Sequence, residues 1–199
     1  MDTPLKIHVI MSTTRRGRYS DKPAAWIMSV LKGKAGIIDA ELIDLREWAL
    51  PFFDEPNSPN SNKGVYENPL GRKWADKVAE ADAYIIIAAE YNHGYPAVLK
   101  NALDWVSGRE WGNKPVAFVG YGSAMGARSI EQLRQVIVEL GMVSVRNAVH
   151  IPSDIFRATY ALEAPGDPAL FAAINPHADR MIEQLVSFAS VLKPTRAQK

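Results

Sequence analysis

Five apolar segments recur along the chain and predict five β-strands. They cover residues 5–11, 37–45, 82–89, 114–120 and 143–151. Segments that stay apolar without alternating polar residues are typical of parallel strands covered on both faces. We therefore expect one buried parallel sheet.

After each strand, apolar residues recur at a spacing of three or four, which predicts five helices. The first helix has Ser20 as its expected N-cap. Strands that alternate with helices predict a three-layer α/β sandwich with right-handed crossovers. A length of 199 residues indicates a single domain over residues 1–199.

The order of the strands is left open by the pattern alone. In the order 2-1-3-4-5, the winding of the sheet reverses between the first and third strands. Doubly wound sheets bind ligands at such a point, beyond the carboxyl ends of the strands. The loops after these two strands would then flank one crevice.

The loop after the first strand is rich in hydroxyl and arginine side chains, a composition suited to a phosphate group. Backbone N–H groups before a helix attract an anion, and arginine adds charged donors. Its candidate ligands are Thr13, Arg15, Arg18, Tyr19 and Ser20. Tyr19 either covers a bound group or shields the loop. The alternative for the whole segment is a solvated basic loop.

The loop after the third strand places four polar or aromatic side chains together. Glu90, Tyr91, Asn92 and His93 follow the strand directly, and Pro96 suits the first turn of the next helix. These side chains combine donors, acceptors and aromatic surface where a ligand is expected. An ordinary strand-to-helix connection is the alternative.

The loop after the fourth strand carries three glycines, Gly120, Gly122 and Gly126. They do not match a dinucleotide fingerprint, because the third glycine comes one residue late and no acidic residue follows about twenty positions on. Tyr121, Gly122 and Ser123 are candidate ligand contacts. A tight structural turn is the alternative.

Two long connections, residues 46–69 and 152–175, are expected to be irregular and either functional or disordered. Phe52, Tyr95 and Tyr160 are candidate walls of a substrate site, although loop packing would also explain them. The tail from residue 193 is expected to fray.

Composition narrows the function classes. Lys and Arg number 23 against 22 Asp and Glu, so the net charge of +1 favours neither nucleic acid nor an anionic membrane as a partner. The absence of cysteine excludes disulfides and thiolate chemistry, and is compatible with the cytoplasm. The four histidines are far apart and form no metal-ligand motif. We therefore expect no metal and no membrane contact.

Residues 90–105 read E-Y-N-H-G-Y-P-A-V-L-K-N-A-L-D-W. This stretch resembles the signature of the NAD(P)H-dependent FMN reductases, flavodoxin-like enzymes that include soluble quinone, chromate and azo-dye reductases. Ala89 stands where the family usually has proline. Residues 12–18 resemble the family's phosphate segment G-S-T-R-x-G-R, with Ser12 where glycine is frequent. Residues 121–128 resemble its third loop, Y-G-[GS]-x-x-G-x-R.

The resemblance implies a flavodoxin-like sheet of order 2-1-3-4-5, bound FMN, NADPH or NADH as co-substrate, and a small-molecule electron acceptor. The phosphate would lie on Thr13, Arg15, Arg18, Tyr19 and Ser20. The flavin ring would lie against Glu90, Tyr91, Asn92 and His93, with Tyr121, Gly122 and Ser123 in the third loop. No catalytic side chain is predicted, since hydride transfer to a flavin needs positioning and no protein nucleophile.

A ping-pong mechanism is also expected. The sequence has no second dinucleotide-binding half, so the nicotinamide and the acceptor would use one face of the flavin in turn. The acceptor is a quinone, free flavin, azo dye or metal oxyanion.

A homodimer or tetramer is predicted from the resemblance and from apolar residues that exceed the apparent need of one sheet face: Leu99, Leu103, Trp105, Val106, Ile130 and Val136. Two other functions remain. A one-electron flavodoxin-type carrier would not be reduced directly by NADPH, and such carriers are usually strongly acidic. A non-enzymatic binding module would be purified without flavin.

Overall fold

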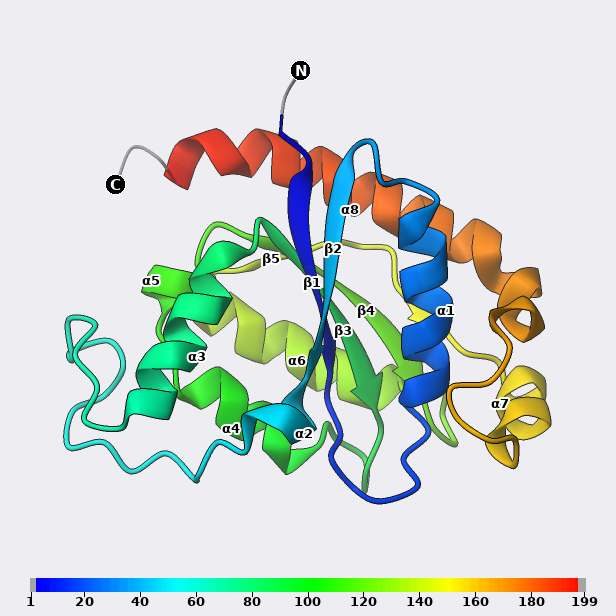
Figure 1. The fold of residues 1–199 in the computed structure, drawn as a ribbon, viewed down its shortest axis with the longest axis horizontal. Helices are drawn as coiled ribbons and strands as arrows, with labels where there is room; N and C mark the ends of the chain where they lie inside the picture. The colour runs from blue at the N-terminus through cyan, green and yellow to red at the C-terminus, as the bar shows by residue number, and fades with distance from the viewer. Residues whose placement is uncertain (1–2, 197–199) are drawn as a thin grey trace.

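The parallel sheet lies at the centre of the computed structural model, which describes residues 3–196 (Figure 1). Its strands are β1 (Leu5–Met11), β2 (Ile38–Asp44), β3 (Ala83–Ala89), β4 (Pro115–Tyr121), β5 (Val143–Ser144) and β6 (Val149–His150). The order is β2-β1-β3-β4-β5, with β6 also pairing with β4, and all these pairs are parallel. The predicted order 2-1-3-4-5 is therefore confirmed.

The five predicted helices cover the sheet from both sides (Figure 1). They are α1 (Asp21–Lys32), α3 (Pro69–Glu80), α4 (Ala97–Asp104), α6 (Ala127–Glu139) and α8 (Asn175–Arg196). Helices α1 and α8 enclose one hydrophobic core against the sheet, and α3, α4 and α6 enclose the other. Every residue of β3 and β4 is buried between these layers, which explains why both strands are apolar throughout. Across residues 3–196, no helix has the length and apolar character needed to cross a bilayer.

The predicted fifth strand is interrupted. β5 and β6 each contribute two residues beside β4, and residues 145–148 separate them. Within this gap, Asn147 bonds helix α8: its N–H donates to Gln184 Oε1 (2.9 Å) and its side-chain amide donates to the Arg180 carbonyl (3.3 Å). A continuous strand over 143–151 was therefore wrong, because contacts from α8 replace part of the ladder.

Short helices occupy the segments that were expected to be irregular. These are α2 (Leu45–Trp48), α7 (Ser153–Tyr160) and the 3-10 helix η1 (Pro168–Ile174), and α5 (Gly108–Trp111) was also unpredicted. With four residues each, α2 and α5 are too short for apolar spacing to indicate a helix. The expected fraying from residue 193 is also wrong as far as Arg196, because Lys193 and Arg196 bond Asp82. Residues 197–199 lie outside the described residues.

The apolar residues that were expected to leave a surface for a second subunit are inside the monomer. Leu99, Leu103, Trp105, Val106 and Ile130 are at most 3% exposed and belong to the core beneath α3, α4 and α6. Val136 packs against the same core. The argument for a second subunit from surplus apolar surface was therefore wrong, because these side chains pack into the core between the sheet and the helices α3, α4 and α6.

Candidate functional site

Three loops meet at the carboxyl ends of β1, β3 and β4. Arg15 Nε of the first loop donates to the Tyr91 hydroxyl of the second at 3.2 Å. The rings of Tyr19 and Tyr121 lie 5.0 Å apart, which joins the first loop to the third. The Glu90 N–H donates to the Tyr121 carbonyl at 3.0 Å and joins the second to the third. The three predicted segments thus form one surface at the point where the winding reverses.

The first loop offers unbonded backbone donors. Within residues 3–196, the N–H groups of residues 13–19 donate no hydrogen bond. Helix α1 begins directly after them, with Ser20 as its N-cap residue. Free amides next to the positive end of a helix form a site for an anion such as phosphate.

Three hydroxyl groups lie beneath this loop. Thr13 Oγ1 and Ser20 Oγ share a hydrogen bond of 2.5 Å, so the predicted N-cap side chain of Ser20 bonds Thr13 and not the helix. The buried Tyr121 hydroxyl lies beside both of these hydroxyls. Burial raises the pKa of Tyr121, so its hydroxyl stays a neutral donor at physiological pH.

The two arginines predicted to bind phosphate have different surroundings. Arg15 is exposed, and its bond to Tyr91 raises its pKa. The Arg18 side chain is only 3% exposed and forms ion pairs with Asp21 and Asp44. Burial alone would lower the pKa of Arg18, but the bonds to these two carboxylates raise it. Arg18 is thus part of the loop's internal structure, in contrast to its predicted role as a phosphate ligand.

The second loop is a tight turn whose residues suit its backbone. Tyr91 and Gly94 exchange two backbone hydrogen bonds of 2.8 and 3.1 Å. Between them, Asn92 and His93 have φ angles of 49° and 73°, as in a type I′ turn. Asparagine tolerates this conformation better than most residues. In the described chain the amides of Asn92 and His93 donate no hydrogen bond, so they remain available to a ligand.

Helix α6 holds this second loop from behind. The Glu90 carboxylate is 2% exposed and pairs with Arg128, whose Nε lies 2.5 Å from Glu90 Oε1. Arg128 Nη1 also lies 3.2 Å from His93 Nδ1, and Gln132 Nε2 donates to the His93 carbonyl at 2.8 Å. The Glu90 side chain is therefore occupied within the protein. Arg128 and Gln132 were not predicted as site residues, although the arginine that ends the third-loop motif is Arg128.

The third loop depends on close backbone packing. Gly122 has φ +137°, and a Cβ there would lie 3.0 Å from the Cβ of Glu90. Gly126 has φ +74°, and a Cβ there would lie 2.5 Å from the Tyr121 nitrogen. These glycines allow the turn to fold onto β4. The Ser123 side chain is exposed on the same turn.

Of the predicted walls, Tyr160 lies beside these loops. Helix α7 places Phe156 4.6 Å from the Tyr19 ring and Tyr160 5.3 Å from Phe156, measured between centroids. Phe52 is 81% exposed and projects from a segment that Trp105 binds through the Pro51 carbonyl. Tyr95 packs against the core formed with α3, α4 and α6. The 152–175 connection thus contributes to the site through α7.

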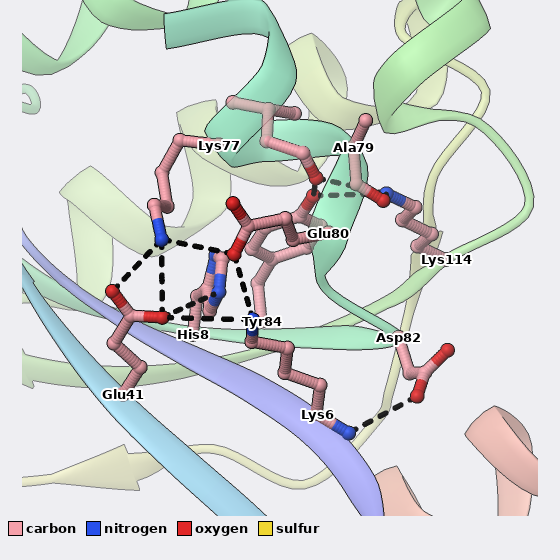
Figure 2. A network of polar contacts seen from close by, with 10 residues as sticks. Lys6, His8, Glu41, Lys77, Ala79, Glu80, Asp82, Tyr84 and Lys114 are labelled. Carbon is pink, nitrogen blue, oxygen red and sulfur yellow. Dashed lines mark hydrogen bonds and ion pairs between the residues drawn. The ribbon is translucent and has the colours of Figure 1, made fainter. Parts of the chain in front are cut away.

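A second polar cluster lies toward the amino ends of β1 and β3 (Figure 2). His8, Glu41 and Glu80 bring three potential metal-ligand atoms within 4.8 Å of one another, a grouping that sequence spacing does not reveal. Lys77 bonds both carboxylates at 3.0 and 2.9 Å, and Lys6 bonds Glu80 at 2.7 Å. The lysines therefore already neutralise the carboxylates, and the cluster is an ion-pair network. Burial lowers the pKa of His8 to about 4.

Comparison with known proteins identifies one family. The family model described as NADPH-dependent FMN reductase matches residues 5–155. An NAD(P)H-dependent FMN reductase of Schizosaccharomyces pombe is 34% identical over 171 residues, which are 86% of this chain and 79% of the relative. A probable NADPH:quinone oxidoreductase of Oryza sativa is 42% identical over 146 residues, 69% of each chain.

Solved structures show the same fold. FerB, a flavoenzyme NAD(P)H:(acceptor) oxidoreductase from Paracoccus denitrificans, superposes with a TM-score of 0.69 at 19% identity. The superposition covers 92% of this chain and 98% of FerB. At this identity the likeness concerns the fold alone.

Proposed function

Because this chain belongs to the NADPH-dependent FMN reductase family, we propose that it passes electrons from NAD(P)H through bound FMN to a quinone or a similar small acceptor. It is an oxidoreductase with FMN as cofactor and NAD(P)H as electron donor. Relatives named as quinone oxidoreductases favour a quinone among the possible acceptors, which also include free flavin, azo dyes and metal oxyanions.

The observation that carries this proposal is the meeting of three loops, two of them with unbonded amides, where the winding of the sheet reverses. The first loop offers an anion site of free amides and exposed Arg15, with the buried Tyr121 hydroxyl nearby. The turn at Asn92 and His93 offers amides that suit the polar edge of a flavin ring. This donor set fits FMN, an anion joined to a flat polar aromatic ring.

Bound FMN would supply the two-electron redox chemistry, and the residues of this chain would bind and orient it. Arg15 and the amides of residues 13–19 would hold the phosphate, with Thr13, Ser20 and Tyr121 beneath. The second and third loops, with Asn92, His93, Gly122 and Ser123, would orient the ring. The Glu90–Arg128 pair fixes the second loop against α6. These assignments fit hydride transfer, which depends on positioning.

The donor and the acceptor would bind in turn at one open face, in a ping-pong mechanism. The three loops enclose the proposed flavin site from the sheet side, and the glycines of the third loop are used for packing. One shared face leaves no room for both substrates at once. Tyr160 on α7 would border that face.

A homodimer or tetramer remains part of the proposal through the resemblance to the family alone. Sedimentation of the protein at micromolar concentration would test it, and a single species of 22.0 kDa would contradict it. The cytoplasmic location likewise stays a prediction, which fractionation of cells can test.

The proposed function is tested by the visible spectrum of the purified protein. A flavin spectrum is expected after mixing with FMN and removing unbound cofactor, and anaerobic addition of NADPH or NADH should bleach it. Heat-released flavin should then chromatograph as FMN. Protein that takes up no FMN would favour a non-enzymatic module, and bound FMN that neither nicotinamide bleaches would favour an electron carrier.

A further inference from the structure

Arginine side chains bind four consecutive carbonyl oxygens of the first loop. The bonds are Arg18 Nη1 to Thr13 O (2.7 Å), Arg46 Nε to Thr14 O (3.3 Å), Arg46 Nη2 to Arg15 O (3.0 Å) and Arg15 Nη1 to Arg16 O (3.2 Å). The amides of the same loop, residues 13–19, donate no bond within the described chain. The carbonyl oxygens of residues 13–16 are therefore hydrogen-bonded to arginine side chains, whereas the backbone amides of the loop stay unbonded.

Every N–H of the Arg18 guanidinium is used inside the protein. Nη1 and Nη2 bond the two carboxylate oxygens of Asp44 at 2.5 Å each. Nε and Nη2 bond Asp21 Oδ1 at 3.0 and 2.6 Å. Together with the bond to Thr13, these contacts use the five donors that a guanidinium has. Arg18 therefore has no donor left for a phosphate.

Asp44 also fixes Arg46. Its Oδ1 accepts a bond of 2.9 Å from the Arg46 N–H, as the N-cap of α2. The exposed Arg46 side chain then reaches back to the first loop, and it pairs with no carboxylate among residues 3–196. A single carboxylate at the end of β2 thus orients the two arginines that bind the carbonyls of residues 13–15. We call Asp44, Arg18 and Arg46 the carbonyl clamp.

We propose that the carbonyl clamp positions the first loop for the phosphate of FMN, with Asp44, Arg18 and Arg46 as positioning residues. This inference rests on the proposed binding of FMN at that loop. A carbonyl oxygen turned toward the site would repel the anion, whereas carbonyls held by guanidinium groups leave the amides free to bind it. A loop already fixed in this form loses less entropy when the phosphate binds. A ligand without the phosphate gains nothing from the clamp.

The test compares FMN with riboflavin, which lacks the phosphate. Arg46→Ala is the first variant, because Arg46 is exposed and its loss leaves the core intact. Titration by flavin fluorescence should show FMN affinity falling about tenfold, the effect of losing one or two hydrogen bonds. Riboflavin affinity should change less than about twofold. A defect that merely loosened the fold would weaken both flavins together.

Arg16→Ala is the matched control, because it also removes one exposed positive charge, here from the first loop that Arg46 contacts. The Arg16 guanidinium has no hydrogen bond within residues 3–196. Its loss should reduce FMN affinity less than about threefold, the effect of a screened charge alone. Arg46→Lys keeps the charge but not the planar fork, and should stay at least about fivefold weaker than wild type.

Equal effects of Arg46→Ala and Arg16→Ala, or an Arg46→Lys variant equal to wild type, would overturn the inference, because charge alone would then explain Arg46. So would an unchanged ratio of FMN to riboflavin affinity in Arg46→Ala. Asp44→Asn provides an independent arm, with its fold checked by circular dichroism, and should lower the same ratio. Wild-type protein that binds neither flavin would instead overturn the proposed function.

Discussion

Arg128 on α6 binds the buried carboxylate of Glu90 through both its side chain and its backbone. Nε lies 2.5 Å from Glu90 Oε1, and the Arg128 N–H donates to Oε2 at 3.2 Å. Glu90 directly follows β3 and opens the second loop, so the pair connects the loop to the helix that follows β4. The conformation of the second loop therefore depends on α6.

Arg128→Ala should lower the free energy of unfolding by about 1–3 kcal/mol, because the Glu90 carboxylate would stay buried without its charged partner. Urea unfolding measures this change. Lys100→Ala is the control: it removes an exposed ion pair with Asp104 and should cost less than about 0.5 kcal/mol. Equal losses in the two variants would show that the burial of Glu90 adds nothing.

Arg15→Ala should weaken FMN binding by about 1.5–3 kcal/mol, the scale of charge-assisted hydrogen bonds. Because Arg15 is exposed, the free energy of unfolding of the variant should differ from that of the wild type by less than about 0.5 kcal/mol. Fluorescence titration and urea unfolding of the same preparation separate the two effects. Full FMN affinity in this variant would remove Arg15 from the phosphate site.

Stability should fall as the pH drops from about 6.5 to about 4, because the pKa of His8 is lowered to about 4 in the folded protein. The unfolded chain takes up this proton first, so acid favours unfolding over that range. The loss attributable to His8 is at most about 3 kcal/mol. Urea unfolding at several pH values should show a smaller loss in His8→Phe, which cannot take up the proton. Parallel pH profiles for both proteins would contradict the assignment.

Asn101→Ala should cost about 2–3 kcal/mol of stability. Its side chain donates to the Pro51 and Leu50 carbonyls at 2.8 and 3.3 Å and accepts from the Phe53 N–H at 3.1 Å. These three backbone groups belong to the connection over residues 46–69. Asn57→Ala, at an exposed position of that connection, should have little effect on urea unfolding. If both variants unfolded like the wild type, Asn101 would not anchor the connection.

Initial rates with NADPH and a benzoquinone should give parallel double-reciprocal lines, as expected for two substrates that bind one site in turn. The reason is the proposed binding of both substrates at one face of the bound flavin. Varying both concentrations over a grid measures the pattern. Intersecting lines would contradict the shared site and leave the assignment of FMN untouched.

The parts of the fold that were predictable depend on local burial. β3 and β4 are covered on both faces, so their sequences are apolar throughout. This pattern was enough to predict them as buried parallel strands. The fifth strand was wrong because Gln184 and Arg180, far along the chain, interrupt it at Asn147. No local pattern carries that information.

The candidate site divides in the same way. The three loops were expected to meet because each follows a parallel strand, and the carboxyl ends of parallel strands lie at one edge of the sheet. Their polar composition indicated a ligand site there. The role of Arg18 was not predictable, since its partner Asp44 lies 26 residues away and also caps α2. The sequence does not show whether the charges of Asp44 and Arg18 are neutralised by partners within the protein.

The interruption of the fifth strand also affects whether this edge of the sheet can pair with a strand of another molecule. A sheet that ends in a long regular strand exposes unpaired N–H and C=O groups, onto which a strand of another molecule can add. Here β5 and β6 present two residues each, and α8 takes polar groups of the gap between them. An added strand would find no continuous ladder on this edge of the sheet.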